Sequence, residues 1–200
     1  MKPPVSMLLP ALAGALLGAT PALAHTPGGE SLSFLSGLAH PVFGPDHVLA
    51  MLAVGLWAQR IGGRAVLVVP VAFALSMIAG FGLGLSHVTL PFVEPMILAS
   101  VVVLGLVVAL AVRPDVWICV VLVGLFALFH GNAHATELGS ADAGGFGLGF
   151  VCATALLHAA GIGIGMSLGR IEARLGVQTN WPSRSVGLGT ASLGLILALA

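Results

Sequence analysis

The stretch from Ala65 to Leu85, AVLVVPVAFALSMIAGFGLGL, contains no charged side chain and is long enough to cross a bilayer as one helix. A transmembrane helix needs roughly 20 mostly apolar residues to span about 30 Å of hydrocarbon. Similar runs recur along the chain, in which 58% of the residues are hydrophobic and only 7% are charged. A soluble domain carries about 25% charged residues. The sequence therefore predicts an all-α fold, a polytopic bundle of transmembrane helices whose first partner is the lipid bilayer.

Glycine, proline and polar residues interrupt the apolar runs and divide them into six predicted spans. The interruptions are the segments 62–63, 91–95, 114–115, 139–145 and 170–185. We expect the spans to form one transmembrane domain over residues 37–200. They cover residues 37–58, 65–85, 93–112, 116–134, 145–168 and 185–200.

Residues 1–24 have the order of a cleavable signal peptide. Lys2 is followed by an apolar stretch over residues 7–17 and then by the A-x-A site Ala22-Leu23-Ala24. An uncleaved first transmembrane helix is the alternative interpretation. Cleavage would make His25 the N-terminus, outside the cytoplasm, and residues 25–36 would form a periplasmic leader, whose segment 26–33 has no periodicity.

The arginines test this topology, because cytoplasmic loops of membrane proteins carry an excess of Lys and Arg. Every arginine follows the first, third or fifth predicted span, and the loops at the other face contain neither Lys nor Arg. This bias predicts a bacterial inner-membrane protein with its mature N-terminus outside. The formal net charge of zero gives no reason to expect a nucleic-acid partner. The arginines are Arg60, Arg64, Arg113, Arg170, Arg174 and Arg184.

Ionisable side chains inside a bilayer cost free energy and mark functional sites. A first group, His40, Asp46 and His47, stands at the start of the first predicted span. The prolines and the glycine within residues 41–45 predict an irregular backbone at this entry, which membranes tolerate only where protein or water covers it. Asp46 could instead cap the helix that follows, a role that explains neither histidine.

A second group, His130, His134 and Glu137, ends the fourth predicted span, with spacings that place all three on one helix face. Two imidazoles and a carboxylate suit a borderline transition metal such as Ni²⁺, Zn²⁺ or Co²⁺. Polar groups lining a wet cleft without metal, or a proton relay, are the alternatives.

The predicted topology brings both groups to the outer face, because the first span runs inward and the fourth runs outward. Glu94 opens the third span on the same side and could join the site, or could serve only as a carboxylate at a helix N-terminus. His158, near mid-depth of the fifth span, could be an inner relay or could bond to a neighbouring helix. The predicted metal-handling residues are His40, Asp46, His47, His130, His134 and Glu137, with Glu94 and His158 as secondary candidates.

Two other function classes remain as alternatives. A membrane-embedded, metal-dependent hydrolase could use the second group, but the chain contains no H-E-x-x-H motif. A metal-binding assembly factor is the other alternative. The chain also has no P-loop signature, so ATP hydrolysis would need a partner. We therefore expect a protein that is not an enzyme and holds no tightly bound cofactor.

Residues 40–55, HPVFGPDHVLAMLAVG, and residues 129–137, FHGNAHATE, resemble the two motifs of the HupE/UreJ family. That family usually has a second glycine where this chain has Ala135, a change that leaves the three predicted ligands intact. The resemblance covers essentially the whole chain. It implies a permease for Ni²⁺, or for Co²⁺ or another divalent ion, with a functional link to hydrogenase or urease maturation proteins. For the alternative of an assembly factor, the resemblance implies a hydrogenase as its partner.

Overall fold

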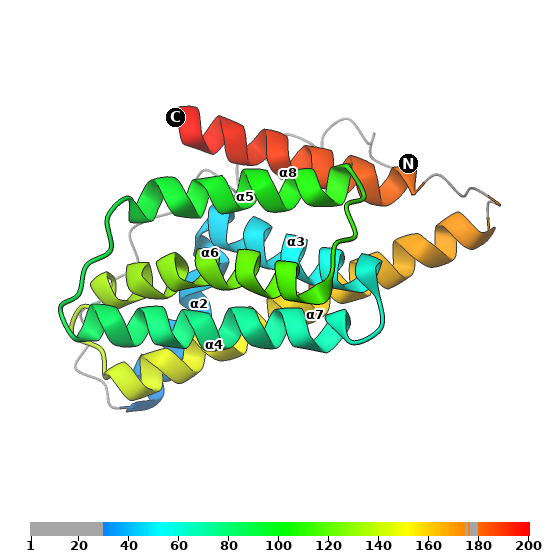
Figure 1. The fold of residues 1–200 in the computed structure, drawn as a ribbon. Helices are drawn as coiled ribbons and strands as arrows, with labels where there is room; N and C mark the ends of the chain where they lie inside the picture. The colour runs from blue at the N-terminus through cyan, green and yellow to red at the C-terminus, as the bar shows by residue number, and fades with distance from the viewer. Residues whose placement is uncertain (1–29, 175, 177–179) are drawn as a thin grey trace, which may run out of the picture.

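The computed structural model describes residues 30–174, 176 and 180–200, so the predicted signal peptide and the first residues of the leader lie outside it. Within these residues the fold is all-α, with seven helices and no strand (Figure 1). The predicted fold class is thereby confirmed in its helical part. The helices are α2 (Glu30–Phe43), α3 (Pro45–Ile61), α4 (Ala65–Leu85), α5 (Val93–Ala109), α6 (Val116–Thr136), α7 (Ala143–Arg174) and α8 (Trp181–Leu199).

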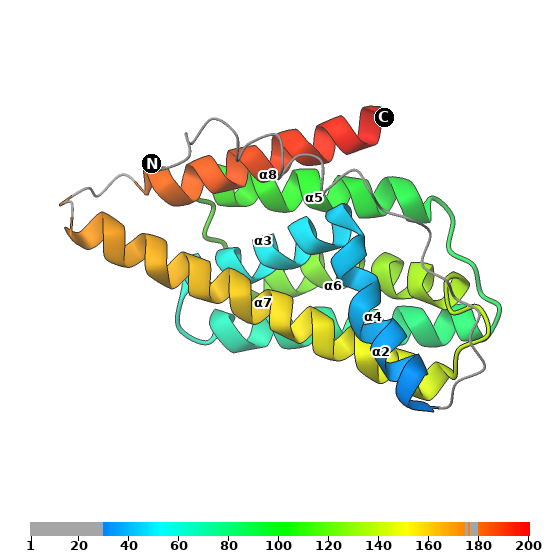
Figure 2. The same cartoon turned by 180° about the vertical axis from the view of Figure 1, so that it is seen from behind.

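The central helix of the bundle is α3, which packs against α2, α4, α5, α7 and α8. Helices α5 and α8 pair as a layer on one side of α3, while α4, α6 and α7 lie on the other (Figures 1 and 2). Consistent with this position, α3 is buried almost continuously from Ala50 to Ala58. Large apolar side chains point away from the bundle on outer helices, as at Leu67, Val121 and Leu195.

Length and composition allow α4, α6 and α7 to cross a bilayer. Helices α2 and α3 together form a fourth candidate, bent by 82° at the break between them. Helix α5 is apolar but has only 17 residues. Up to four spans are therefore supported in the described part of the chain, and crossings by α5 and α8 remain predictions.

The irregular backbone predicted within residues 41–45 is confined to one break at Gly44, where α2 and α3 bend by 82°. Helix α2 already begins at Glu30 and continues through Pro41, and the chain breaks only at Gly44, which is extended with φ −91° and ψ 107°. Pro41 has no N–H to donate to the Gly37 carbonyl, so α2 lacks one hydrogen bond of its last turns and ends two residues later. Pro45 occupies the first turn of α3, where a missing N–H breaks no helical hydrogen bond.

Two glycines let α3 and α7 approach backbone to backbone. A Cβ on Gly55 would overlap the carbonyl group of His158, and a Cβ on Gly161 would overlap that of Leu52. Close approach through small residues is the usual way that membrane helices associate. This contact fixes the position of His158 relative to α3.

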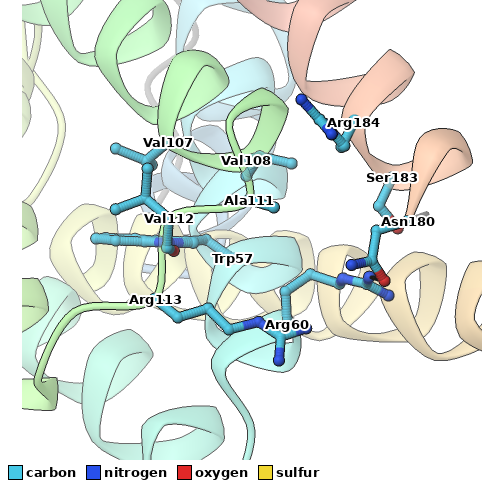
Figure 3. A pocket seen from close by; sticks show the side chains of 10 residues that line it. All are labelled: Trp57, Arg60, Val107, Val108, Ala111, Val112, Arg113, Asn180, Ser183 and Arg184. Carbon is cyan, nitrogen blue, oxygen red and sulfur yellow. Dashed lines mark hydrogen bonds between the residues drawn. The ribbon is translucent and has the colours of Figure 1, made fainter. Parts of the chain in front are cut away.

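Polar contacts close the end of the bundle that carries the arginines (Figure 3). The Arg60 guanidinium donates to Glu172 of α7 at 3.0 Å and to the side chain of Asn180, and the Ser183 hydroxyl donates to Glu172 at 3.3 Å. Here the cavity beside Trp57 measures about 10 Å³, at the lower limit for one water molecule. The arginine end is therefore tightly packed.

Candidate metal centre

Three potential metal ligands from α2 and α6 meet at the end opposite the arginines. His40 lies in the last turn of α2, His134 in the last turn of α6, and Glu137 is the C-cap of α6. The His40 Nε2 atom donates to Glu137 Oε2 at 2.6 Å, and His134 Nδ1 lies 3.7 Å from the same oxygen. One ligand atom from each residue lies within 4.8 Å of the other two. This spacing is compatible with one ion bound between them.

The Glu137 carboxylate lies just past the end of α6, and its side chain is 42% exposed. Burial raises the pKa of this carboxyl, but the imidazoles of His134 and His40 lower it more strongly, so the net pKa is below the ordinary value. The group is therefore an anion at neutral pH, as a metal ligand must be.

Asp46 and His47 form an adjoining group in the first turn of α3. The Asp46 carboxylate accepts the backbone N–H of His47 at 2.8 Å and contacts His47 Nδ1 at 3.0 Å. Asp46 is therefore not the N-cap of α3, which is Gly44, but it satisfies one free N–H of the first turn and orients an imidazole. A carboxylate that holds one nitrogen of a histidine leaves the other nitrogen for a metal.

The imidazole of His47 joins the two groups. Its ring centroid lies 4.9 Å from that of His130 and 4.9 Å from that of His134. The His134 ring in turn lies 5.1 Å from the His40 ring. The six predicted residues, which come from three helices, therefore form one continuous cluster.

Several ring nitrogens in this cluster have no hydrogen-bond partner in the part of the chain that the structure describes. They are His47 Nε2, His130 Nε2 and both nitrogens of His134, all on buried residues. An unpaired buried polar atom costs about 1–3 kcal/mol. His130 also shows which nitrogen is free, because its Nδ1 lies 3.0 Å from the Phe126 carbonyl and must carry the proton there. Its Nε2 lone pair is then available to a cation.

Residues 13–197 match the family model described as HupE / UreJ protein. The chain belongs to the HupE / UreJ family. Protein HupE of Rhizobium leguminosarum bv. viciae is 45% identical over 148 residues, which cover 73% of this chain and 78% of that protein. No solved structure gives a significant match. The resemblance inferred from the two histidine motifs is confirmed, and both motifs lie inside the matched residues.

Glu94 of this HupE / UreJ protein is exposed in the first turn of α5. It lines a hollow of about 310 Å³ together with Thr89, Asn132 and Thr136. It does not belong to the group of three ligand atoms formed by His40, His134 and Glu137. The structure therefore places this secondary candidate beside the cluster, at the start of a helix.

Asn132 is a residue that the sequence reasoning missed. It is fully buried, its Oδ1 accepts the backbone N–H of Leu90 at 3.1 Å, and its Nδ2 donates to the Val88 carbonyl at 2.9 Å. These bonds attach the connection between α4 and α5 to the histidine-bearing turn of α6. The sequence did contain a sign of this role: Asn132 is an amide between two histidines of an apolar helix, and polar side chains in membrane helices form hydrogen bonds to neighbouring helices.

Proposed function

We propose that this HupE / UreJ protein is a secondary permease that carries Ni²⁺, as its substrate, into the cell and supplies a nickel enzyme such as a hydrogenase or a urease. One observation carries the proposal: three ligand atoms within 4.8 Å of one another adjoin buried imidazoles whose nitrogens lack partners. Neutral imidazole and carboxylate together suit a borderline divalent ion such as Ni²⁺.

In this proposal the ion loses water stepwise at the outer mouth. Glu137 and His40 are the most exposed members of the cluster and meet the hydrated ion first, whereas His134 is fully buried. His47 and His130 receive the ion next, and His158 offers a transfer point deeper in the bundle. Conduction needs several moderate sites, because one tight cage would not release the ion. The membrane potential drives a divalent cation inward without ATP.

The proposed topology has six crossings, made by the bent pair α2–α3 and by α4, α5, α6, α7 and α8, behind a cleaved signal peptide. The arginines support it, because each lies at the end of the bundle opposite the metal cluster or in a connection at that end. We place that end in the cytoplasm and the protein in the bacterial inner membrane.

Uptake of radioactive nickel by cells tests the function. We expect His47→Ala and His130→Ala to abolish uptake at limiting external nickel while protein levels in the membrane stay normal. Leu195→Ala, an exposed position on α8, is the matched control and should transport normally. Unchanged uptake in both histidine variants would refute the proposal.

Reconstituted protein separates a permease from the other function classes. A permease carries Ni²⁺ into liposomes that contain no other protein. An assembly factor would bind the ion without flux, and a hydrolase would require a substrate to be cleaved. Absence of flux from liposomes under an inward Ni²⁺ gradient would reject transport by the chain alone.

A further inference from the structure

A second set of donor atoms lies deeper in the bundle, between α4 and α7. His158 is 2% exposed, and its Nε2 atom has no hydrogen-bond partner among the described residues. Met77 and Thr154 are fully buried, and the Thr154 hydroxyl donates to the Met77 sulfur at 3.6 Å. A hydroxyl that points at a thioether leaves its own oxygen lone pairs free.

Two contacts between α4 and α7 place the Met77–Thr154 pair one helical turn from the Phe73–His158 pair. Phe73 packs edge to face against His158, with ring centroids 5.1 Å apart, and Met77 follows Phe73 by one turn of α4. Thr154 precedes His158 by one turn of α7 and contacts Met77. Residues four apart on a helix share one face, so the imidazole, the hydroxyl and the thioether lie along the same seam.

The Phe73 ring separates His158 from His130 of the outer cluster. It packs edge to face against His130 on one side, at 5.6 Å between centroids, and against His158 on the other. His158 is held from behind as well, because its carbonyl group lies against Gly55 of α3. An ion that passes His130 would meet Phe73 next and then His158 on its far side.

We propose that His158 Nε2, the Met77 sulfur and the Thr154 hydroxyl form a second, sulfur-containing cation site, distinct from the His40–Glu137 cluster. The proposal rests on the proposed function and extends it by giving the path an inner site of different chemistry. Thioether sulfur binds softer metal ions, whereas Mg²⁺, Ca²⁺ and Mn²⁺ prefer oxygen. The outer cluster attracts divalent cations through its carboxylates, and the inner site admits those that accept sulfur and imidazole.

The test counts the Ni²⁺ ions bound by the full chain in lipid nanodiscs, by equilibrium dialysis with radioactive nickel. We expect His158→Gln to bind one ion fewer per chain than the unmutated protein. Met77→Leu keeps nearly the same volume and apolar character, so it folds, and it should weaken the second binding step. Loss of a partner outside the coordination shell already costs about 10–100-fold in affinity, so loss of the sulfur should cost at least tenfold.

Met166→Leu is the matched control, because this methionine lies on α7 with 44% of its surface exposed. It should bind Ni²⁺ as the unmutated protein does. The inner site is overturned if either His158→Gln or Met77→Leu retains the same number of ions and the same binding steps as the unmutated chain.

The flux measurement and the count of bound ions test the proposed function and the inner site independently. If reconstituted protein carries no Ni²⁺ across liposomes, the proposed function fails, yet the ion count still tests the inner site. If flux is present and the count is unchanged in the variants, the inner site alone is rejected. Excess Mn²⁺ adds a second measurement: it should displace Ni²⁺ from the outer cluster more readily than from the inner site, and equal displacement contradicts the sulfur ligand.

Discussion

Replacement of Gly131 by alanine should separate α4 from α6 at the cluster of histidines and carboxylates. Gly131 lies between His130 and Asn132 on α6, where the backbone of α4 passes directly alongside. A Cβ added to Gly131 would overlap the Met77 carbonyl and would lie 2.8 Å from the backbone nitrogen of Phe81. Both neighbours are backbone groups, so no change of side-chain rotamer relieves the overlap.

The expected magnitude follows from two opposing terms. Alanine in place of glycine inside a helix contributes about 1 kcal/mol through helix propensity. Forcing a methyl group into a closely packed contact costs about 1–3 kcal/mol. Gly163→Ala on α7 is the matched control, because a Cβ there would meet nothing within 4 Å and only the favourable term applies. The propensity term is common to both variants, so they should differ in free energy of unfolding by the packing cost, about 1–3 kcal/mol.

The assay is reversible unfolding of the purified protein by a denaturing detergent, followed by circular dichroism, together with Ni²⁺ binding in nanodiscs. Gly131→Ala should unfold at a lower denaturant fraction than the unmutated protein, and Gly163→Ala at an equal or higher one. Ni²⁺ binding should weaken in Gly131→Ala only, because moving α6 carries His130 away from His47, whose ring is now 4.9 Å distant. Equal stability of the two alanine variants would refute the close contact between α4 and α6.

Three further perturbations follow from other contacts. Glu137→Gln should weaken Ni²⁺ binding about 10–100-fold. The pKa of Glu137 is lower in the folded protein than in the unfolded chain, so its carboxylate stabilises the fold near neutral pH and this stabilisation is lost as the pH falls through the folded pKa. The melting temperatures of Glu137→Gln and of the unmutated protein should therefore converge in acid. A difference that widens in acid would contradict the ion pair. Glu172→Leu leaves Arg60 unpaired and should cost about 3–5 kcal/mol in detergent unfolding, much of it recovered by adding Arg60→Met; a double variant no more stable than Glu172→Leu would argue against the pair. Asn132→Ala should cost about 1–3 kcal/mol by leaving two backbone groups of the connection between α4 and α5 unpaired, and limited proteolysis there should accelerate, whereas unchanged cleavage would exclude the anchoring role.

The helical elements were predictable from the sequence because apolar runs and their interruptions are local features. The predicted span 65–85 coincides with α4, and the span 116–134 differs from α6 only at its end. The entry at residues 40–47 was wrong in detail, since α2 continues through Pro41 and breaks only at Gly44. Pro41 removes one hydrogen bond from the last turns of α2 without breaking the helix at that residue.

The residues of the candidate site could be predicted because few ionisable residues occur in the apolar runs. Each of them costs free energy inside a bilayer and therefore indicates a functional role. Spacing could relate His130, His134 and Glu137, which share one helix face. It could not relate His47 to His130, nor Met77 to His158, because their contacts join different helices. The arrangement of Phe73 between two imidazoles has no local signature either.

By itself, then, the sequence determined the class of the protein, the positions of most helices and the residues of the outer cluster. These depend on composition and on spacing along one helix. Only the tertiary structure decided the 82° bend before α3, the anchoring role of Asn132 and the contact between Thr154 and Met77. Each of these depends on how closely two helices approach, and that distance is set where glycines such as Gly55 and Gly131 let backbones touch.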